Sequence, residues 1–450
     1  MSKPLMISVS GIRGIVGEGL SPDSIIKYTA AAGTLFGAGR VMVGRDSRVT
    51  GEMVKHAVIS GLMAVGCTPV DLGVCATPTV ELAVKTSDAV GGIIITASHN
   101  PIQWNALKLL GSEGMFLDPD QGEKVKRIAD NGDFAWKTWD QIGQMEEDST
   151  ATDSHIQHIL GLSVLDVSQI KQRNFKVAFD SVNGAGGLIV PRLLEALGCN
   201  VFPLNEEPTG RFAHSPEPVP QNLADLSAHV KKSGADVGFA VDPDADRLAV
   251  VNEKGDPIGE EYTLALAVQF ILSKEKGPVV ANLSTSRVID DIAAEYGVEV
   301  VRTKVGEIHV STRMKEIGAI IGGEGNGGVI LPENLFGRDA MAAIVLILQS
   351  MAETGKSISE IWRSLPQYAM SKKKIEIENE NPDAILERLT TQYANDKINQ
   401  MDGLKIEWPK SWVQVRKSNT EPIIRIMAEA PNLQEAETLC DRLIHDIQKG

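Results

Sequence analysis

The strongest constraint on the fold is a threefold repetition within this chain of 450 residues. Segments 40–73, 175–204 and 277–306 each contain a strand rich in β-branched residues, a polar loop, an amphipathic helix and a second strand. A glycine suited to a left-handed helix end follows each helix. These glycines are Gly66, Gly198 and Gly297. Such units form βαβ folds with parallel strands, so we predict three related α/β domains.

Each repeat is followed by a further apolar strand that ends in an unusual polar loop. The loops read TASHNP (96–101), DPDADR (242–247) and GEGNGG (323–328). Ligands of open α/β sheets bind at the carboxyl ends of strands. We therefore expect the three loops to converge on one cleft. Three unrelated turns are the alternative, and the repeated placement favours convergence.

The chain after about residue 370 departs from this repetition. Short apolar strands and a final amphipathic helix over residues 432–450 predict a small α+β domain. A chain of this length exceeds one hydrophobic core and predicts about three or four domains. The predicted domains are residues 1–153, 154–255, 256–368 and 369–450.

Charge and composition exclude several classes of protein. The formal net charge is −15, from 44 basic and 59 acidic residues, which argues against a general binder of nucleic acid or another polyanion. The four cysteines are scattered, as is typical of reduced thiols in a cytoplasmic protein. Neither a signal peptide nor a bilayer-spanning segment is apparent, so we expect a cytoplasmic protein without a membrane partner.

Ser98 stands in the polar loop that follows the apolar residues 93–95. A nucleophile held at the top of a sheet is one interpretation, and an ordinary polar turn is the other. A Ser-His hydrolase is a further alternative, but the G-x-S-x-G elbow is absent. Adjacent residues on an extended chain point apart, so we expect His99 to be poorly placed as a base for Ser98.

The loop DPDADR carries three alternating carboxylates, from Asp242, Asp244 and Asp246. In an extended loop these groups share one side, and three oxygen ligands suit Mg²⁺. Their mutual repulsion also favours a bound cation. An EF-hand is excluded because Arg247 occupies the sixth position, where glycine is needed. An acidic surface turn remains the alternative interpretation.

The loop GEGNGG matches a dinucleotide-binding G-x-G-x-x-G pattern, but Pro332 interrupts the helix that such a site requires. Glu324 and Asn326 among glycines better suit the hydroxyl groups of a sugar. A flexible glycine turn fits this motif equally well when the motif is considered alone.

The segment RKSNTEPIIR (416–425) combines guanidinium groups and hydroxyls in a pattern typical of phosphate binding, with a solvated basic turn as the alternative. Its candidate residues are Arg416, Ser418, Asn419, Thr420 and Arg425. Arg45 and Arg48 fit ordinary salt-bridging arginines better than ligands. A serine, a metal loop, a sugar loop and a phosphate loop together predict phosphoryl transfer by positioning and charge neutralisation.

Seven motifs occur in one order along the whole chain: SGIRG, GRDSR, TASHNP, DPDADR, TKVG, GEGNGG and RKSNTEP. In this set the sequence resembles the α-D-phosphohexomutase superfamily. The resemblance implies an α/β fold, in which three related α/β domains with mixed sheets and a C-terminal α+β domain surround a central cleft. It also implies interconversion of hexose 6-phosphate and hexose 1-phosphate through a phosphoserine and a bound 1,6-bisphosphate.

The resemblance further implies roles for individual residues. Ser98 corresponds to the phosphoserine, whose phosphate ligates Mg²⁺ together with the three aspartates of DPDADR. Glu324 and Asn326 match the sugar-binding loop, and the candidates in segment 416–425 match the phosphate-binding loop. Arg13 and Lys108 also match family positions, and Lys304 of TKVG is a further substrate-binding candidate that an ordinary surface lysine would explain equally well.

Three positions depart from the family pattern. Pro243 and Ala106 replace usual glycines, and Gly328 stands where some relatives have a histidine proposed for acid–base work. The proton carrier is then Lys108, Arg13, Arg247 or the substrate phosphate. We expect His99 to contact phosphate or substrate.

The Glu-x-Asn-Gly-Gly form of the sugar loop is similar to that of phosphoglucosamine-mutase-type members. We therefore expect glucosamine phosphate as substrate, with mannose and glucose phosphates as alternatives, and glucose or glucosamine 1,6-bisphosphate as intermediate or activator. A serine-based sugar phosphatase and a sugar-phosphate-binding protein are alternatives from other classes. The expected assembly is a monomer or a homodimer.

Overall fold

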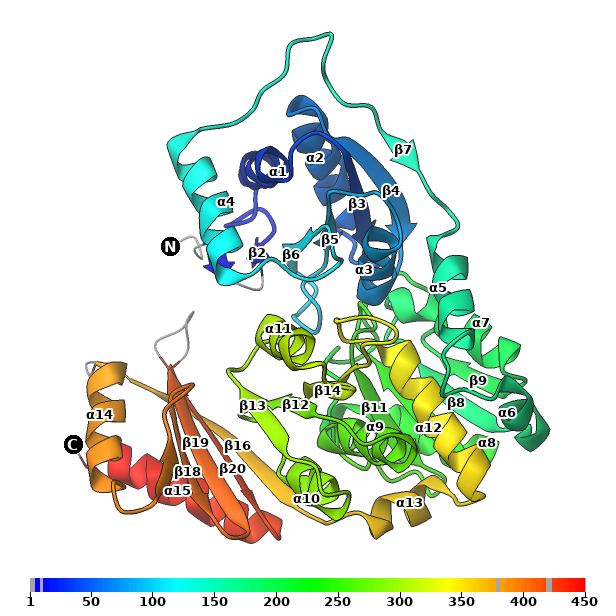
Figure 1. Cartoon of the computed structure of the whole chain (residues 1–450), viewed down its shortest axis with the longest axis vertical. Helices are drawn as coiled ribbons and strands as arrows, with labels where there is room; N and C mark the ends of the chain where they lie inside the picture. Colours follow the sequence, from blue (N-terminus) through cyan, green and yellow to red (C-terminus); the bar gives the residue numbers. More distant parts are fainter. Residues whose placement is uncertain (1–4, 9–10, 378–380, 418–422, 450) are drawn as a thin grey trace.

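The computed structural model describes residues 5–8, 11–377, 381–417 and 423–449. Four β-sheets follow one another along this described chain. They form an arc in Figure 1, with the first sheet at the top, the second at the right, the third at the lower centre and the fourth at the lower left. The parts built around these sheets are called the first to fourth domains.

The first three domains repeat one sheet topology. In each, three strands are parallel, and a fourth strand pairs antiparallel with the third. The corresponding strand orders are β6-β5-β3-β4, β11-β10-β8-β9 and β15-β14-β12-β13. These mixed sheets confirm the predicted α/β class. Each of the three polar loops joins the third strand to the antiparallel fourth, so all three loops occupy the same place in the topology.

The first domain extends this quartet to a seven-stranded sheet. Its strands are β1 (Met6–Ser8), β2 (Gly11–Ile15), β3 (Arg40–Arg45), β4 (Thr68–Val74), β5 (Gly91–Ile95), β6 (Trp104–Gly111) and β7 (Glu146–Glu147). Its helices are α1 (Pro22–Phe36), α2 (Gly51–Ala64), α3 (Thr77–Lys85) and α4 (Pro119–Asn131).

The second domain has a four-stranded sheet. Its strands are β8 (Lys176–Asp180), β9 (Asn200–Leu204), β10 (Val237–Val241) and β11 (Leu248–Asn252). Its helices are α5 (Ala151–Leu160), α6 (Val167–Arg173), α7 (Val190–Ala196) and α8 (Ala224–Ser233).

The third domain repeats the four-stranded sheet. Its strands are β12 (Val279–Asn282), β13 (Val300–Thr303), β14 (Ile321–Glu324) and β15 (Gly328–Ile330). Its helices are α9 (Glu261–Lys274), α10 (Val288–Glu295), α11 (Glu307–Ile317), α12 (Ala340–Thr354) and α13 (Ile358–Ser364). The φ angles of the predicted helix-ending glycines are positive, at 84° for Gly66, 74° for Gly198 and 70° for Gly297.

The fourth domain is an antiparallel sheet with two helices, which confirms the predicted α+β tail. Its strands are β16 (Ala369–Glu376), β17 (Lys397–Asn399), β18 (Leu404–Trp408), β19 (Ser411–Lys417) and β20 (Ile423–Ala430). Its helices are α14 (Pro382–Gln392) and α15 (Leu433–Gln448). Their apolar faces and the sheet form a core of their own.

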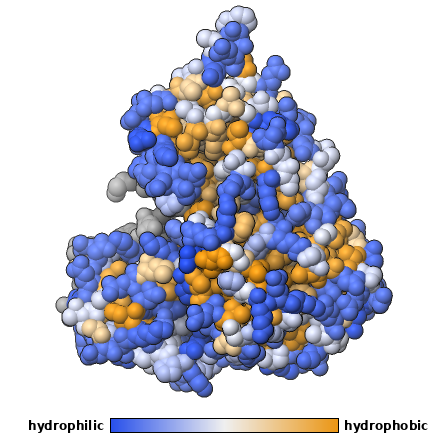
Figure 2. Space-filling model, viewed as in Figure 1, coloured by the Kyte–Doolittle hydropathy of each residue, from blue (hydrophilic) through white to orange (hydrophobic). Residues whose placement is uncertain are grey.

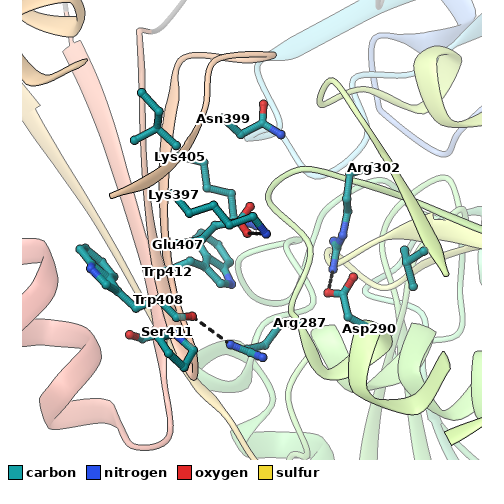
Figure 3. Close-up of a pocket in the computed structure, with 13 residues that line it drawn as sticks. Arg287, Asp290, Arg302, Lys397, Asn399, Lys405, Glu407, Trp408, Ser411 and Trp412 are labelled. Carbon is teal, nitrogen blue, oxygen red and sulfur yellow. Dashed lines mark hydrogen bonds and ion pairs between the residues drawn. The ribbon is translucent and has the colours of Figure 1, made fainter. Parts of the chain in front are cut away.

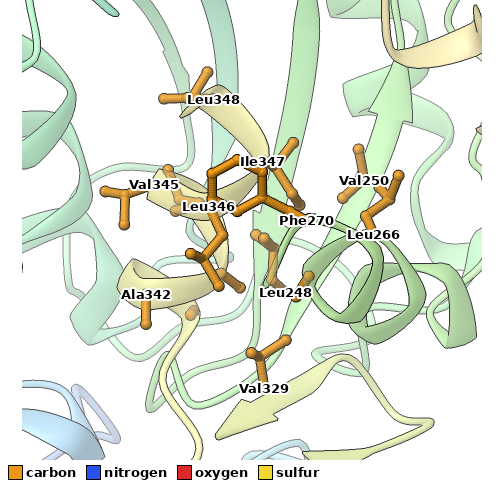
Figure 4. Close-up of a cluster of buried hydrophobic side chains, with 14 of the residues drawn as sticks. Leu248, Val250, Leu266, Phe270, Val329, Ala342, Val345, Leu346, Ile347 and Leu348 are labelled. Atoms are coloured by element: carbon orange, nitrogen blue, oxygen red, sulfur yellow. The ribbon is translucent and has the colours of Figure 1, made fainter. Parts of the chain in front are cut away.

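The second and third domains share one hydrophobic core. Figure 4 shows Leu248 and Val250 of β11 beside Leu266 and Phe270 of α9, with Leu346 of α12 packed against them. Removing this apolar surface from water stabilises both domains together. The first domain has separate apolar clusters. The continuous core therefore fixes the second domain against the third.

One predicted domain boundary lies inside a helix, and the other two lie between secondary-structure elements. The boundary after residue 153 lies inside α5, whereas the boundaries after residues 255 and 368 lie between elements. Their exact positions remain predictions. The four cysteines are buried and free, and no helix within the described ranges has the length and apolar character needed to cross a membrane.

The outer surface is indented on the left of Figure 2, between the first domain above and the fourth domain below. Mainly hydrophilic residues line both rims of this indentation in that view.

Candidate active site

The Ser98 loop joins β5 to β6. Ser98 has a φ of 49°, a left-handed conformation that is uncommon for a residue with a side chain. Its amide donates to Thr96 Oγ1 at 2.9 Å, and its Oγ donates to Asp242 Oδ2 at 2.7 Å. The loop of the first domain thus contacts the aspartate loop of the second domain directly.

The structure corrects the expected position of His99. Its Nδ1 lies 3.3 Å from Ser98 Oγ, because the positive φ of Ser98 breaks the extended geometry on which the expectation depended. Burial, followed by the charges of Arg247 and Arg13, lowers the pKa of His99 well below its ordinary value. The Ser98 hydroxyl proton is directed at Asp242, so His99 Nδ1 faces a lone pair of Ser98 Oγ.

Arg48 holds the backbone of the Ser98 loop in place. Its fully buried guanidinium pairs with Asp46, with Nε 3.0 Å from Oδ2. It also donates to four backbone carbonyl oxygens, those of Ser98, Asn100, Pro101 and Trp104. Buried carbonyl groups need such partners. Arg48 is therefore an ion-paired arginine, as expected, and in addition the support of the loop that carries Ser98.

The aspartate loop joins β10 to β11. One ligand atom from each of Asp242, Asp244 and Asp246 lies within 4.8 Å of the others, and all three side chains are buried. Two side chains of the first domain reach Asp244 Oδ2: Thr77 Oγ1 donates at 2.8 Å and Lys108 Nζ at 2.7 Å. The predicted convergence of carboxylates on one side is therefore present, with donors from another domain beside them.

The charges of this cluster are unevenly compensated. Burial, followed by repulsion from Asp244 and Asp246, raises the pKa of Asp242 well above its ordinary value. Burial acts on Asp244 in the same direction, but the Lys108 ammonium outweighs it and lowers the pKa of Asp244. The pKa of Lys108 is raised, because attraction to Asp244 and Asp246 outweighs its burial. Lys108 is accordingly a charged partner of the aspartate loop.

The residues present fit a divalent cation with oxygen ligands. Asp244 Oδ1 and Asp246 Oδ1 are buried without a hydrogen-bond partner in the described part of the chain. Unpaired anionic oxygens are costly in a low-dielectric interior, and carboxylate oxygens are preferred ligands of Mg²⁺. The aspartate cluster is consistent with a Mg²⁺ site, with Ser98 Oγ 2.7 Å from one of its oxygens.

Arg338 links the aspartate loop to the third polar loop. Its terminal nitrogens donate to Asp246 Oδ2 at 2.6 Å and to Glu324 Oε2 at 2.7 Å, and its Nε lies 3.1 Å from Glu307 Oε2. These carboxylates outweigh burial and raise the pKa of Arg338, while Arg338 outweighs burial at Glu324 and lowers the pKa of that carboxyl. The loops of three domains therefore form one buried polar network.

Asn326, also predicted to bind substrate, lies beside Glu324. Its Oδ1 accepts from Gly328 N at 3.2 Å, and its Nδ2 donates weakly to Glu324 Oε2 at 3.4 Å. Asn326 is partly exposed whereas Glu324 is buried. Asn326 therefore keeps hydrogen-bonding capacity for a ligand.

Arg13 and Arg247 border the same network. Arg13 NH1 donates to Asn100 Oδ1 at 3.4 Å, and burial followed by the charge of Arg247 lowers the pKa of Arg13. Arg247 Nε lies 3.9 Å from Asp242 Oδ2, and no described residue accepts a hydrogen bond from it. Both guanidinium groups therefore have donors available for an anion near Ser98. Lys304 is exposed in the loop between β13 and α11.

The predicted phosphate-binding residues belong to β19, β20 and their connection. Arg416 and Arg425 are directly opposed in adjacent strands. Arg416 Nε donates to Asp402 Oδ1 at 2.9 Å, and Asp402 Oδ2 accepts from Val305 N of the third domain at 2.8 Å. Within the described ranges no hydrogen bond joins either arginine to the Ser98 or aspartate loop. The other predicted members, Ser418, Asn419 and Thr420, lie outside the described residues.

Arg338 and Glu307 of this network were not identified from the sequence, and Arg48 was assigned only a salt bridge. A signal existed for Arg338, because the tripeptide Gly-Arg-Asp at 337–339 repeats the one at 44–46, at the end of β3. Glu307 gave no such signal, since an acidic residue in the first turn of a helix is common.

Comparison with known proteins agrees with this architecture. Four family models of phosphoglucomutase/phosphomannomutase match in order: alpha/beta/alpha domain I at residues 5–136, domain II at 153–255, domain III at 259–368 and the C-terminal domain at 373–445. A phosphoglucomutase/phosphomannomutase family protein from Burkholderia thailandensis has a similar structure, with a TM-score of 0.85, 27% identity and coverage of 99% of this chain and 97% of that chain.

Two relatives match over nearly the full length of the chain. A probable phosphoglucosamine mutase of Methanopyrus kandleri is 38% identical over 98% of this chain and 97% of its own length. A phosphoglucomutase/phosphomannomutase of Thermococcus kodakarensis is 39% identical over 98% of both. The four domains, their convergent loops and these relatives show that the chain is a phosphohexomutase and belongs to the phosphoglucomutase/phosphomannomutase family.

Proposed function

We propose that this phosphohexomutase converts glucosamine 6-phosphate to glucosamine 1-phosphate, with Ser98 as the phosphoryl carrier. The observation that supports the role of Ser98 best is its contact with the aspartate loop. Ser98 Oγ lies 2.7 Å from Asp242 Oδ2, at the point where buried charges of two domains meet. A hydroxyl in this place can carry a phosphoryl group whose charge a cation and nearby arginines neutralise.

The proposed reaction consists of two phosphoryl transfers. In the first, the bond between Ser98 Oγ and phosphorus breaks as the free sugar hydroxyl bonds to phosphorus and loses its proton, which gives a 1,6-bisphosphate. The intermediate then turns within the cleft. In the second, the bond from the other sugar oxygen to phosphorus breaks, Ser98 Oγ regains a phosphoryl group, and the sugar oxygen takes up a proton. Protons and phosphoryl groups therefore balance over one turnover.

The chain supplies binding, orientation and proton transfer. Arg48 fixes the Ser98 loop, and Arg13 and Arg247 offer guanidinium donors to the phosphoryl group. Lys108, whose Nζ donates to Asp244 Oδ2, is one candidate for proton transfer beside the aspartate loop. Mg²⁺ held by the three aspartates would supply Lewis-acid neutralisation of the phosphoryl oxygens.

The remaining residues would bind the rest of the substrate. Glu324 and Asn326 are proposed to accept and donate hydrogen bonds to the sugar hydroxyls. Lys304 and the arginines Arg416 and Arg425, together with Ser418, Asn419 and Thr420, are proposed to hold the second phosphate. Since the two ends of the sugar occupy this place in turn, it must accept either phosphate.

The choice of glucosamine phosphate is supported by the sugar-loop sequence and by the Methanopyrus kandleri relative named as a probable phosphoglucosamine mutase. The Thermococcus kodakarensis relative, named as a phosphoglucomutase/phosphomannomutase, supports the alternative. The test measures kcat/KM for the 6-phosphates of glucosamine, mannose and glucose with one preparation, by ³¹P NMR. We expect glucosamine 6-phosphate to give the highest value, and a higher value for either other sugar contradicts the substrate assignment.

The role of Ser98 has its own test. Ser98→Ala should remove nearly all mutase activity toward every sugar while its melting temperature stays close to that of the unaltered chain. A serine-based phosphatase would instead release inorganic phosphate in proportion to substrate consumed. Mutase activity in Ser98→Ala, or such release by the unaltered chain, contradicts the proposal.

A further inference from the structure

A second cavity, of about 720 Å³, lies between the third and fourth domains. None of the residues that line it belongs to the candidate active site. Figure 3 shows its two walls: Arg287 and Arg302 belong to the third domain, and Lys397 and Lys405 face them from the fourth. Cavities of this size bind small molecules in many proteins.

Most charges of this cavity are paired within the protein. Arg302 pairs with Asp290 and also donates to three backbone carbonyl groups. Lys397 Nζ lies 2.7 Å from Glu407 Oε2. Lys405 is the exception, because no carboxylate of the described chain lies within 4.0 Å of its Nζ. The cavity therefore contains an ammonium group without a direct counterion.

Because Lys405 is buried, the absence of a direct counterion for its ammonium group is energetically unfavourable. Its side chain is buried, its Nζ donates to Leu283 O at 2.8 Å, and the same atom lies 4.1 Å from the centre of the Trp412 ring. Burial, followed by the charge of Arg302, lowers the pKa of Lys405 to about 7, although the more distant carboxylates of Glu407, Asp290 and Glu429 act in the opposite direction. A buried cation gains most from a counterion placed beside it.

Arg287 supplies a second cationic group from the opposite wall. Its NH1 donates to Trp408 O at 3.3 Å and its NH2 lies 3.6 Å from Asp291 Oδ1, but its Nε is buried and has no hydrogen-bond partner among the described residues. Val300 and Ile398 add apolar surface to the same cavity. The lining thus combines donors for an anion with a surface for an organic group.

We propose that this cavity binds a small phosphorylated organic anion, whose phosphate contacts Lys405 of the fourth domain and Arg287 of the third. Such a ligand joins the two domains across their interface and opposes their separation. An effect on turnover rests on the proposed mutase function, because it requires the fourth domain to move during the reaction. Binding itself does not depend on that function.

Adenosine 5′-monophosphate is the probe, with the full-length chain studied by titration calorimetry. We expect Lys405→Met to weaken binding at least tenfold and Arg287→Gln to weaken it severalfold. Lys410→Met is the matched control: it removes one positive charge from the turn between β18, which carries Lys405, and β19, is exposed, and does not line the cavity. It should leave binding unchanged, as should Arg425→Ala in the predicted phosphate loop.

Proton uptake adds a readout that a merely structural lysine would not change. At pH 8 the unaltered chain should take up a proton on binding, measured from titrations in two buffers of different ionisation enthalpy. Lys405→Met should show no such uptake. The proposal is overturned if the probe does not bind, if Lys405→Met and Arg287→Gln bind it normally, or if only Arg425→Ala loses binding. Loss of mutase activity in Ser98→Ala is independent of each of these results.

Discussion

The junction between the second and third domains differs in kind from the junction between the third and fourth. The former has a continuous apolar core and the buried Arg338, which pairs with carboxylates of both domains. The latter depends on hydrogen bonds such as Ser284 Oγ to Gln414 Oε1, at 2.6 Å, and encloses the cationic cavity. The fourth domain has its own core.

The difference between these two junctions indicates which parts of the candidate site keep fixed positions relative to one another. Burial of a shared core makes two domains unfold together, whereas a polar interface permits relative movement. The aspartate and sugar loops belong to the domains with the shared core. The arginines proposed to bind phosphate, Arg416 and Arg425, belong to the fourth domain. The aspartate loop and the Glu324 loop are therefore fixed against each other, whereas under the proposed function the distal phosphate is held by a separate domain.

The largest effect should come from Arg338→Met, which breaks the polar part of the fixed junction. The change leaves Asp246, Glu307 and Glu324 without their shared cation, and such losses cost about 3–5 kcal/mol. Calorimetry should show a lower melting temperature for the second and third domains together. Arg313→Met, which breaks an exposed pair with Glu316, is the control and should change little. Equal melting temperatures for the two variants would contradict this account.

A cavity in the shared core should have the next largest effect. Leu346→Ala removes a side chain that is 1% exposed, and comparable substitutions cost about 2–5 kcal/mol. The second and third domains should again melt together, at a lower temperature. The matched substitution Leu443→Ala in the fourth domain should lower only the transition of that domain. If Leu346→Ala separated the second and third domains into two transitions, the claim of one core would be wrong.

The pH dependence of stability tests a buried carboxyl group at the junction of the third and fourth domains, that of Glu261. Glu261 accepts a hydrogen bond from Ser286 N and lies near Lys372 of the fourth domain. Burial raises the pKa of Glu261 to about 8. The folded chain binds this proton more tightly than the unfolded chain, so the associated stability is lost as pH rises from about 4.5 to 8, at up to about 1.4 kcal/mol per pH unit.

Glu261→Gln retains an acceptor but does not titrate. Its stability relative to the unaltered chain should therefore increase between pH 5 and pH 8, as measured by chemical denaturation at each pH. Glu360→Gln, at an exposed helix start, serves as the comparison. A Glu261→Gln difference that is constant over this range would show that Glu261 is not protonated in the folded chain.

The smallest effect should come from the polar junction. Ser284→Ala removes one hydrogen bond to Gln414 and should cost about 1 kcal/mol. Amide hydrogen exchange should increase at the interface of the third and fourth domains, while the Ser98 and aspartate loops keep their protection. Faster exchange at the Ser98 loop would contradict the separation of a fixed centre from a movable fourth domain.

The repeated sheet and the convergence of the three polar loops could be predicted from the sequence. Strand patterns, the glycines after the helices and the position of each polar loop all repeat, and parallel strands bring equivalent loops to one edge of the sheet. The cluster of Asp242, Asp244 and Asp246 followed from their spacing. These features depend on local sequence, which a single chain displays directly.

Other features depended on long-range contacts. The side chain of His99 lies beside Ser98 Oγ because Ser98 has a positive φ. The loop TASHNP contains no glycine that would have indicated this backbone conformation. Arg48 and Arg338 act through partners about 50 and 90 positions away in sequence. The cavity around Lys405 exists only where two domains face each other. Burial and charge at such places follow from the assembled fold.

The central claim is that Ser98 carries the transferred phosphoryl group. The most direct test supplies glucosamine 1,6-bisphosphate labelled with ³²P to the dephosphorylated chain and locates the label by digestion and mass spectrometry. The account predicts label on the peptide that contains Ser98, its transfer to glucosamine monophosphate on a second incubation, and no stable label in Ser98→Ala. Label on another residue, or turnover without any labelled protein, would contradict it.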